Sequence, residues 1–243
     1  MKSELRIFKD VDTLSREAAE IFVQQAAQAI AERGRFLVAL NGGSTPLKFF
    51  QALATEYRHR INWSKTHVFW GDERCVPPND PASNYAQAHE VMLSRVSIPE
   101  ANIHRIKGEL EPAEASRDYA LTLKGFSSPP LDVPRFDLVY LGMGEDGHTA
   151  SLFPGSPVNA AGPTLPVIAH YENRPAHRVT LTPLVFNQAR MVVFMVTGEK
   201  KSVVLAEVLR GRYNPERYPA QRINPHDGKL IWLVDADAAR HLS

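Results

Sequence analysis

The sequence predicts an α/β protein, built on a mostly parallel, doubly wound sheet with helices on both faces. Two short apolar runs, 36–40 and 136–141, are typical of buried parallel strands. Between such runs, apolar residues recur at helical spacing, most clearly over residues 14–30. Strands that alternate with helices favour a parallel sheet that is covered on both sides. The sequence has no internal repeat, low-complexity tract or clear linker, so we expect a single domain over residues 1–243.

Each element is assigned from local signals. The first strand begins within the opening residues, and we expect Asp12 or Thr13 to cap the first long helix and Gly34 to end it. Pro46 is typical of a first helical turn and opens a helix over 47–57. Further helices are expected at 84–93, 113–123 and 199–209, and further strands at 67–70, 177–181, 191–196 and 230–234, with a short helical turn before 191. We expect the segments 156–166 and 211–228 to be irregular connections.

The charge balance argues against two broad classes of function. With 28 Lys and Arg against 27 Asp and Glu, the net charge is +1, whereas proteins that bind nucleic acid or a membrane surface usually carry a basic face. A small basic pocket for an anionic metabolite is compatible with this balance. The single cysteine, Cys75, excludes an intrachain disulfide. No histidine stands beside it to activate it, so we interpret Cys75 as a small, partly buried residue.

The amino terminus gives no targeting signal. Lys2, Glu4 and Arg6 stand where a signal peptide would be apolar. No run approaches the ~18 apolar residues that a membrane span needs. We therefore expect a cytoplasmic protein that binds a small molecule, and a monomer, with weak self-association left open.

A glycine-rich turn joins the strand at 36–40 to the next helix. Within it, Gly43 frees the backbone, while Ser44 and Thr45 offer hydroxyl groups. The first amides of a helix are unpaired and its dipole is positive there, so this turn predicts an anion site. A tight turn with a hydroxyl cap explains it equally well. The turn lacks the lysine of a P-loop and the spacing of a dinucleotide fingerprint, so neither kind of nucleotide site is predicted.

Three charged residues, Asp72, Glu73 and Arg74, follow the strand at 67–70. Charges at the end of a buried strand are costly unless they pair with each other or with a ligand. Arg74 is suited to bind a phosphate or to polarise a carbonyl group. A surface ion-pair cluster is the alternative explanation, and by itself the more common one.

The stretch 142–155 carries the strongest functional signal. Three of its glycines, Gly142 and Gly144 among them, allow a sharp turn after a strand, at the sheet edge where α/β proteins place their chemistry. Asp146 and His148 lie in that turn, so the carboxylate can fix the tautomer of the imidazole. A lone histidine is more often structural, but this setting favours a catalytic one. Asp-Gly-His supplies too few ligands for a metal site.

Two further cations, Arg178 and Lys201, stand beside predicted strand ends. Each is compatible with a solvated surface charge and with a phosphate ligand.

Taken together, these segments resemble the family that holds 6-phosphogluconolactonase and glucosamine-6-phosphate deaminase. The resemblance covers most of the chain, with ordered motifs at 42–46, 71–74, 83–85, 142–155, 178–182 and 198–201. It implies a three-layer fold shared with ribose-phosphate isomerases and no metal or organic cofactor. The implied reaction is hydrolysis of 6-phospho-D-glucono-1,5-lactone to 6-phospho-D-gluconate, the second step of the oxidative pentose phosphate pathway.

The resemblance also assigns roles by position. His148 corresponds to the catalytic histidine, Asp146 to its neighbour and Arg74 to the arginine that faces the substrate. The positions expected near the phosphate are Ser44, Thr45, Arg178 and Lys201. We expect His148 to take a proton from water and later to donate one to the leaving ring oxygen. Arg74, or amides of the turn at 142–144, would meet the oxyanion.

Two other functions stay open. A deaminase of this family carries a glutamate that supports its histidine, but the corresponding residue here is Phe153, which can neither accept nor donate a proton. This position favours the lactonase. The other alternative is a sugar-phosphate-sensing module without activity. Related folds with that role are joined to a DNA-binding segment, and no basic helix-turn-helix precedes the first strand here.

Overall fold

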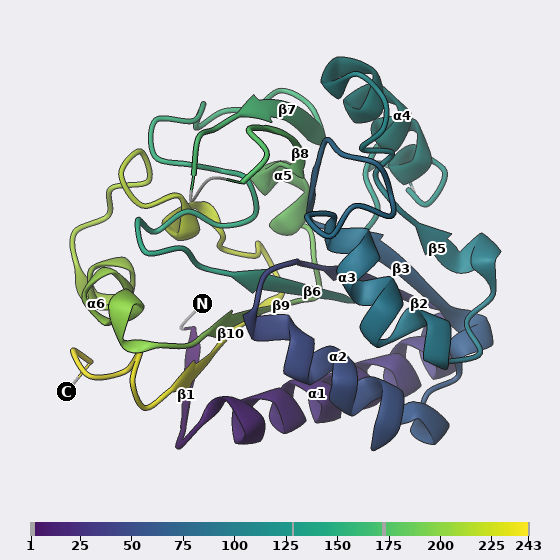
Figure 1. Ribbon diagram of the computed structural model, residues 1–243, viewed down its shortest axis with the longest axis horizontal. Helices are drawn as coiled ribbons and strands as arrows, with labels where there is room; N and C mark the ends of the chain where they lie inside the picture. Colours follow the sequence, from purple (N-terminus) through teal and green to yellow (C-terminus); the bar gives the residue numbers. More distant parts are fainter. Residues whose placement is uncertain (1–2, 128, 172–173, 243) are drawn as a thin grey trace.

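The computed structural model describes residues 3–127, 129–171 and 174–242. Its centre is a seven-stranded sheet in the order β1-β10-β9-β6-β2-β3-β5, and all of its strand pairings are parallel, as predicted (Figure 1). The strands are β1 (Glu4–Phe8), β2 (Phe36–Leu40), β3 (Thr66–Trp70), β5 (Ile103–His104), β6 (Leu138–Gly142), β9 (Met191–Val196) and β10 (Lys229–Asp235).

Helices flank the central sheet on both faces. On one side α1 (Val11–Arg33) and α2 (Thr45–Thr55) lie side by side, and on the other side lie α4 (Pro112–Lys124) and α5 (Pro183–Phe186) (Figure 1). The remaining helices are α3 (Asn84–Val91), next to α2, and α6 (Ser202–Arg210), which follows β9. Short 3-10 turns occur at Arg58–Arg60, Trp63–Lys65, Leu93–Arg95, Glu100–Asn102, Glu199–Lys201 and Pro219–Arg222. Among the described residues, no helix is both long and apolar enough to cross a bilayer.

The first helix begins earlier than predicted. Asp10, rather than Asp12 or Thr13, is its N-cap, because the Asp10 carboxylate accepts a hydrogen bond from the Thr13 amide at 2.8 Å. The apolar pattern begins about one turn after the first helical residue, so the predicted start of the helix was too far along the chain. The other end is confirmed: Gly34 closes the helix in the left-handed conformation, with φ of 76°.

A second, three-stranded sheet was not predicted. It pairs β4 (Asp72–Arg74), β8 (His177–Leu181) and β7 (Thr164–Ile168) in antiparallel fashion. The segment 177–181 is therefore a strand, as expected, but not of the parallel sheet, and the end of the expected loop 156–166 is also a strand. Pro166 is tolerated because β7 is an edge strand, bonded to β8 on one side only.

The strand order creates a switch point between β2 and β6. From β2 the chain winds outward to β3 and β5, whereas from β6 it winds the other way to β9 and β10. The segments that follow β2 and β6 therefore leave the sheet in opposite directions. Such a crevice at the carboxyl ends of the strands is the usual ligand site of open α/β sheets.

Aromatic packing between α1, α2 and the sheet holds this crevice in place. Phe49 of α2 lies 4.6 Å from the ring of Tyr140 in β6, and Phe22 of α1 lies 5.1 Å from Phe36 in β2. The buried Tyr140 hydroxyl donates to the Ala18 carbonyl at 2.6 Å, so its polar atom is satisfied. The strands that present the functional residues are thus tied to the core.

Candidate functional site

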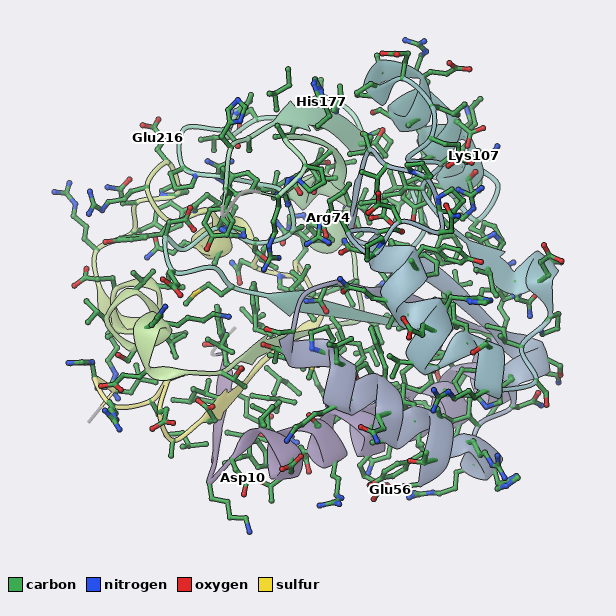
Figure 2. All side chains as sticks on the ribbon, in the orientation of Figure 1. Asp10, Glu56, Arg74, Lys107, His177 and Glu216 are labelled. Carbon is green, nitrogen blue, oxygen red and sulfur yellow. The ribbon has the colours of Figure 1, made fainter. Side chains whose placement is uncertain are left out.

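A cavity of about 210 Å³ opens at the switch point. It is walled by the turns after β2 and β6, by the small sheet and by the turn before α6, and Arg74 lies near the centre of the molecule (Figure 2). The lining residues used below include all the predicted positions except Glu73 and Asp146: Gly43, Ser44, Thr45, Asp72, Arg74, Gly142, Gly144, His148, Arg178 and Lys201. Segments far apart in the sequence therefore meet in one site.

The imidazole of His148 is held by Asp146. His148 Nδ1 lies 2.6 Å from Asp146 Oδ1, and the His148 amide donates to the same oxygen at 3.0 Å. Burial alone would raise the pKa of Asp146, but the hydrogen bonds and charge of His148 outweigh it and leave this pKa below its ordinary value. An ionised carboxylate only accepts hydrogen bonds, so Nδ1 must carry the proton. In the neutral ring Nε2 then bears the lone pair, as a general base requires.

Gly144 leaves the space that the imidazole fills. A Cβ atom on Gly144 would lie 2.1 Å from His148 Nδ1 and 2.9 Å from Asp146 Oδ1. The Gly144 amide donates to the His148 carbonyl at 2.9 Å, which closes the turn. Ala150, which also lines the cavity, has a φ of 49°, a conformation that costs a non-glycine residue roughly 1–2 kcal/mol. The turn therefore has a fixed, partly strained shape.

Two buried arginines face each other across the small sheet. Arg74 in β4 and Arg178 in β8 are register partners, and they are only 5% and 3% exposed. Like charges directly opposite in a sheet destabilise it. Burial lowers the pKa of Arg178, and the charge of Arg74 lowers it further, while Asp72 raises it. The guanidinium of Arg178 also lies 5.4 Å from the ring of Phe153. This arrangement is favourable for binding an anion.

Asp72 is held at the cavity wall by two neutral donors. Ser151 Oγ donates to Asp72 Oδ2 at 2.6 Å, and Asn84 Nδ2 donates to Asp72 Oδ1 at 3.2 Å. Asp72 is 6% exposed, and its negative charge raises the pKa of Arg178. Asp72 therefore partly compensates the arginine pair.

Glu73 was predicted as a site candidate together with Asp72 and Arg74, but it does not line the cavity. It points to the start of α3, where its carboxylate accepts hydrogen bonds of 2.7–2.9 Å from the amides of Arg74, Asn84 and Tyr85 and from the Ser83 hydroxyl. Burial raises the pKa of Glu73, although these hydrogen bonds oppose the effect. Through these hydrogen bonds Glu73 holds the segment that carries Arg74 against the start of α3.

The amino end of α2 provides the other side of the cavity. Gly43 has a φ of 105°, which only glycine adopts easily, and Ser44 precedes the first helical residue, Thr45. The Ser44 side chain makes no capping hydrogen bond, whereas the Thr45 hydroxyl lies 3.0 Å from that of Thr197. The hydroxyl cap, which was the alternative explanation of this turn, is thus not formed by Ser44. Lys201, which ends the turn Glu199–Lys201, lines the same cavity.

Sequence reasoning missed several residues of the cavity wall. These are Asn41, Gly42, Asn84, Met143, Glu145, Ala150, Tyr171 and Arg174. Asn84 stood in a quoted motif but had been given no role. No sequence signal marked Tyr171, whose ring lies 4.7 Å from that of His148. Its position depends on how the small sheet folds over the site.

Cys75 is half-buried, as predicted, and burial raises the pKa of its thiol to about 11. A thiol of this kind is a poor nucleophile near neutral pH. Over the described ranges, no group of three or more His, Cys, Asp or Glu side chains is placed to hold a metal ion.

The fold and the site together define an α/β enzyme that acts on a small anionic molecule. A histidine with a fixed tautomer faces a cavity with four cationic residues, Arg74, Arg174, Arg178 and Lys201, against two acidic ones, Asp72 and Glu145.

The comparisons with known proteins give the family. The profile of the glucosamine-6-phosphate isomerases/6-phosphogluconolactonase family matches residues 9–232, and the chain belongs to this family. A Synechocystis protein named 6-phosphogluconolactonase is 39% identical over 244 residues, which cover 100% of this chain and 99% of that protein. The crystal structure of 6-phosphogluconolactonase from Thermotoga maritima is 28% identical with a TM-score of 0.84, over 96% of this chain and 100% of that chain.

A monomeric glucosamine-6-phosphate deaminase shares the fold. Its TM-score is 0.84 at 17% identity, over 98% of this chain and 99% of that chain. This likeness confirms the predicted kinship of fold and says nothing more specific about the reaction.

Proposed function

We propose that this chain hydrolyses 6-phospho-D-glucono-1,5-lactone to 6-phospho-D-gluconate. The observation that carries the proposal is the imidazole of His148, oriented by Asp146, beside a cavity with an excess of cationic side chains. The names of the relatives support the same substrate. Phe153 lies 4.5 Å from the His148 ring, where it offers no proton-transfer group, and this supports the lactonase over the deaminase.

In the proposed mechanism His148 acts first as a base. Water attacks the lactone carbonyl carbon while His148 Nε2 takes its proton. The tetrahedral intermediate then breaks its bond to the ring oxygen, and the imidazolium returns the proton to that oxygen. The products are a hydroxyl group and a carboxylic acid, which ionises in water. Asp146 stabilises the transient imidazolium and keeps Nδ1 protonated throughout.

Arg74 is the expected oxyanion donor that the contacts of the site favour over the Gly144 amide. The Gly144 amide is already bonded to the His148 carbonyl, so it is not free to meet the developing charge. Arg74 lines the cavity, and it is positioned by its Nη1 donating to the Ala82 carbonyl at 2.6 Å. Its Nε is buried without a hydrogen-bond partner among the described residues. A fixed guanidinium of this kind stabilises the oxyanion without reorganising during the reaction.

The phosphate would bind away from the bond that breaks. The amino end of α2, with Ser44, and the side chains of Arg178 and Lys201 supply positive potential at the cavity wall. Anchoring the phosphate orients the lactone carbonyl toward His148, which reduces the entropy cost of reaching the transition state. The phosphate ligands should therefore affect substrate binding more than the chemical step.

The decisive experiment compares lactone hydrolysis by the wild type and by His148→Ala, with freshly prepared lactone and subtraction of the spontaneous rate. We expect kcat to fall by about 10²–10⁴-fold, the usual effect of losing a general base. Arg178→Ala and Lys201→Ala should mainly raise KM. Glucosamine 6-phosphate serves as the control substrate, and turnover of it would favour the deaminase. An unchanged rate in His148→Ala would refute the mechanism.

We also infer a monomer of one domain in the cytoplasm, and the single cysteine supports the reducing compartment. Light scattering after size-exclusion chromatography tests the oligomeric state.

A further inference from the structure

A second charged cavity lies at the opposite, amino-terminal edge of the central sheet. It has a volume of about 340 Å³ and is bordered by the end of α1 and the starts of β2, β6 and β9. Four arginines and one carboxylate line it: Arg33, Arg35, Arg135, Arg190 and Asp137. The rest of its wall is largely apolar and includes Phe126, Leu131 and Val133. The reaction proposed above uses none of these residues.

The single carboxylate of this cavity is already shared. Asp137 Oδ1 lies 3.0 Å from Arg33 Nε and 3.4 Å from Arg190 Nε, while Oδ2 accepts the Leu37 amide at 2.8 Å. The Asp137 side chain is only 5% exposed. One buried negative charge thus serves two guanidinium groups and a backbone amide, which leaves the cluster with an excess of positive charge.

The other acidic neighbours do not cancel this excess. Glu32 pairs with Arg33, and Asp227 pairs with Arg135 at 2.6 Å, but both carboxylates are about half exposed or more, and exposed pairs contribute little. Burial lowers the pKa of Arg190, and the charges of Arg33 and Arg135 lower it further. A lowered arginine pKa indicates that an added anion would be favourable at this place.

Arg35 is the arginine best placed to accept a ligand. Within the described part of the chain it has no carboxylate at ion-pair distance, and its guanidinium lies 5.3 Å from the centre of the Phe126 ring. Guanidinium groups bind phosphate oxygens through paired hydrogen bonds, and a phosphate monoester offers up to two negative charges and three acceptor oxygens. The adjoining apolar wall suits the organic part of such a molecule.

We propose that this amino-edge cavity is a second binding site, for a phosphate monoester, with Arg35 and Arg190 as its main ligands. The site is separated from the catalytic cavity by the length of the sheet strands, because the two lie at opposite ends of β2 and β6. Binding at one site therefore leaves the other accessible, so the two sites can be titrated in the same protein.

The test uses phenyl phosphate as the probe, with inorganic phosphate as the headgroup alone. Calorimetric titration of the wild type should show two sites for phenyl phosphate. The double variant Arg35→Gln/Arg190→Gln should lose one of them, or weaken it at least tenfold, and keep its lactone hydrolysis. Arg95→Gln/Arg210→Gln is the matched control, because it removes the same charge from exposed positions outside this cavity.

Several outcomes would overturn the proposal. They are the absence of any phenyl phosphate site outside the catalytic cavity in the wild type, an isotherm of the Arg35/Arg190 variant equal to that of the wild type, or an equal loss in the control. Inorganic phosphate binding as tightly as phenyl phosphate would refute the role of the apolar wall. Arg35→Gln alone provides a second variant, because Arg35 pairs with no carboxylate that folding would need. A crystal soaked with phenyl phosphate must show density beside Arg190.

Discussion

Replacing Gly144 with alanine tests whether the position of the His148 ring controls the reaction. The added Cβ would lie 2.1 Å from His148 Nδ1 and 2.2 Å from Cε1, whereas ordinary contacts begin at 3.4 Å, so the ring must move by roughly 1.3 Å. A ring movement of this size would also break the 2.6 Å hydrogen bond between His148 Nδ1 and Asp146 Oδ1. A misplacement of about 1 Å can cost about 10²-fold in rate.

We therefore expect Gly144→Ala to lower kcat about 100-fold while KM for the lactone changes little. The reason is that Arg178 and Lys201, the cationic residues that would bind the phosphate, lie on other segments, in β8 and in the turn Glu199–Lys201. The assay is initial-rate hydrolysis of fresh lactone, followed by proton release in weak buffer. Circular dichroism of the variant establishes that it is folded.

Gly162→Ala is the matched control for this substitution. A Cβ at Gly162 would come no closer than 3.7 Å to another atom, and this glycine does not need a positive φ. Its kcat should stay within twofold of the wild type. If Gly144→Ala retains more than half of the wild-type kcat, ring position does not control the rate, and the assignment of His148 as the base loses its structural support.

Three further predictions concern the carboxylate of Asp146, the imidazole of His104 and the buried arginine Arg222. Asp146→Asn should lower kcat about 10²-fold or more with little change in melting temperature, because an amide no longer holds Nδ1 in its protonated state; wild-type kinetics would contradict this. Partial burial lowers the pKa of His104 to about 4, so the stability that its neutral form retains above about pH 6.5 is lost as pH falls from there toward 4. Because His104 is only half-buried and solvent screens part of the effect, His104→Phe should lose about 1 kcal/mol less stability than the wild type between pH 7 and 5 in urea titrations, and parallel losses would disprove it. Arg222 donates from Nε, Nη1 and Nη2 to the carbonyls of Pro215, Pro157 and Ser156, respectively. Arg222→Met should therefore lower the free energy of unfolding by about 2–4 kcal/mol. The variant Arg222→Lys should recover less than half of that loss, because an ammonium group cannot reproduce the three-way geometry of the guanidinium.

The parallel sheet was predictable because its signals are local. The run at 36–40 is apolar throughout and that at 136–141 is apolar except for Asp137, and such runs are typical of buried parallel strands. The turn at 142–148 was predictable for the same reason, because glycines, the carboxylate and the imidazole are close in sequence. Residues that are two positions apart in sequence, such as Asp146 and His148, stay close in space however the rest of the chain folds.

The small antiparallel sheet could not be predicted in this way. Its strand Asp72–Arg74 consists of three charged residues and has no apolar alternation. Its edge strand contains Pro166 and was interpreted as part of a loop. Pairing with β8, across about a hundred residues for β4 and across a short connection for β7, decides that these segments are strands, and single-sequence periodicity contains no information on such pairing. Tyr171 and Arg174 reach the cavity through the same sheet, which is why they were missed.

The arginine pair shows what this sheet adds to the site. Arg74 and Arg178 were each expected to bind an anion, but the sequence did not indicate that they are opposite one another in register. Two buried like charges in that position destabilise the fold, and hydrophobic residues there would stabilise it. The charge of Asp72 offsets that of Arg178 only in part. A phosphate or a developing oxyanion supplies the missing negative charge, so the cost to folding becomes binding energy when the substrate is present.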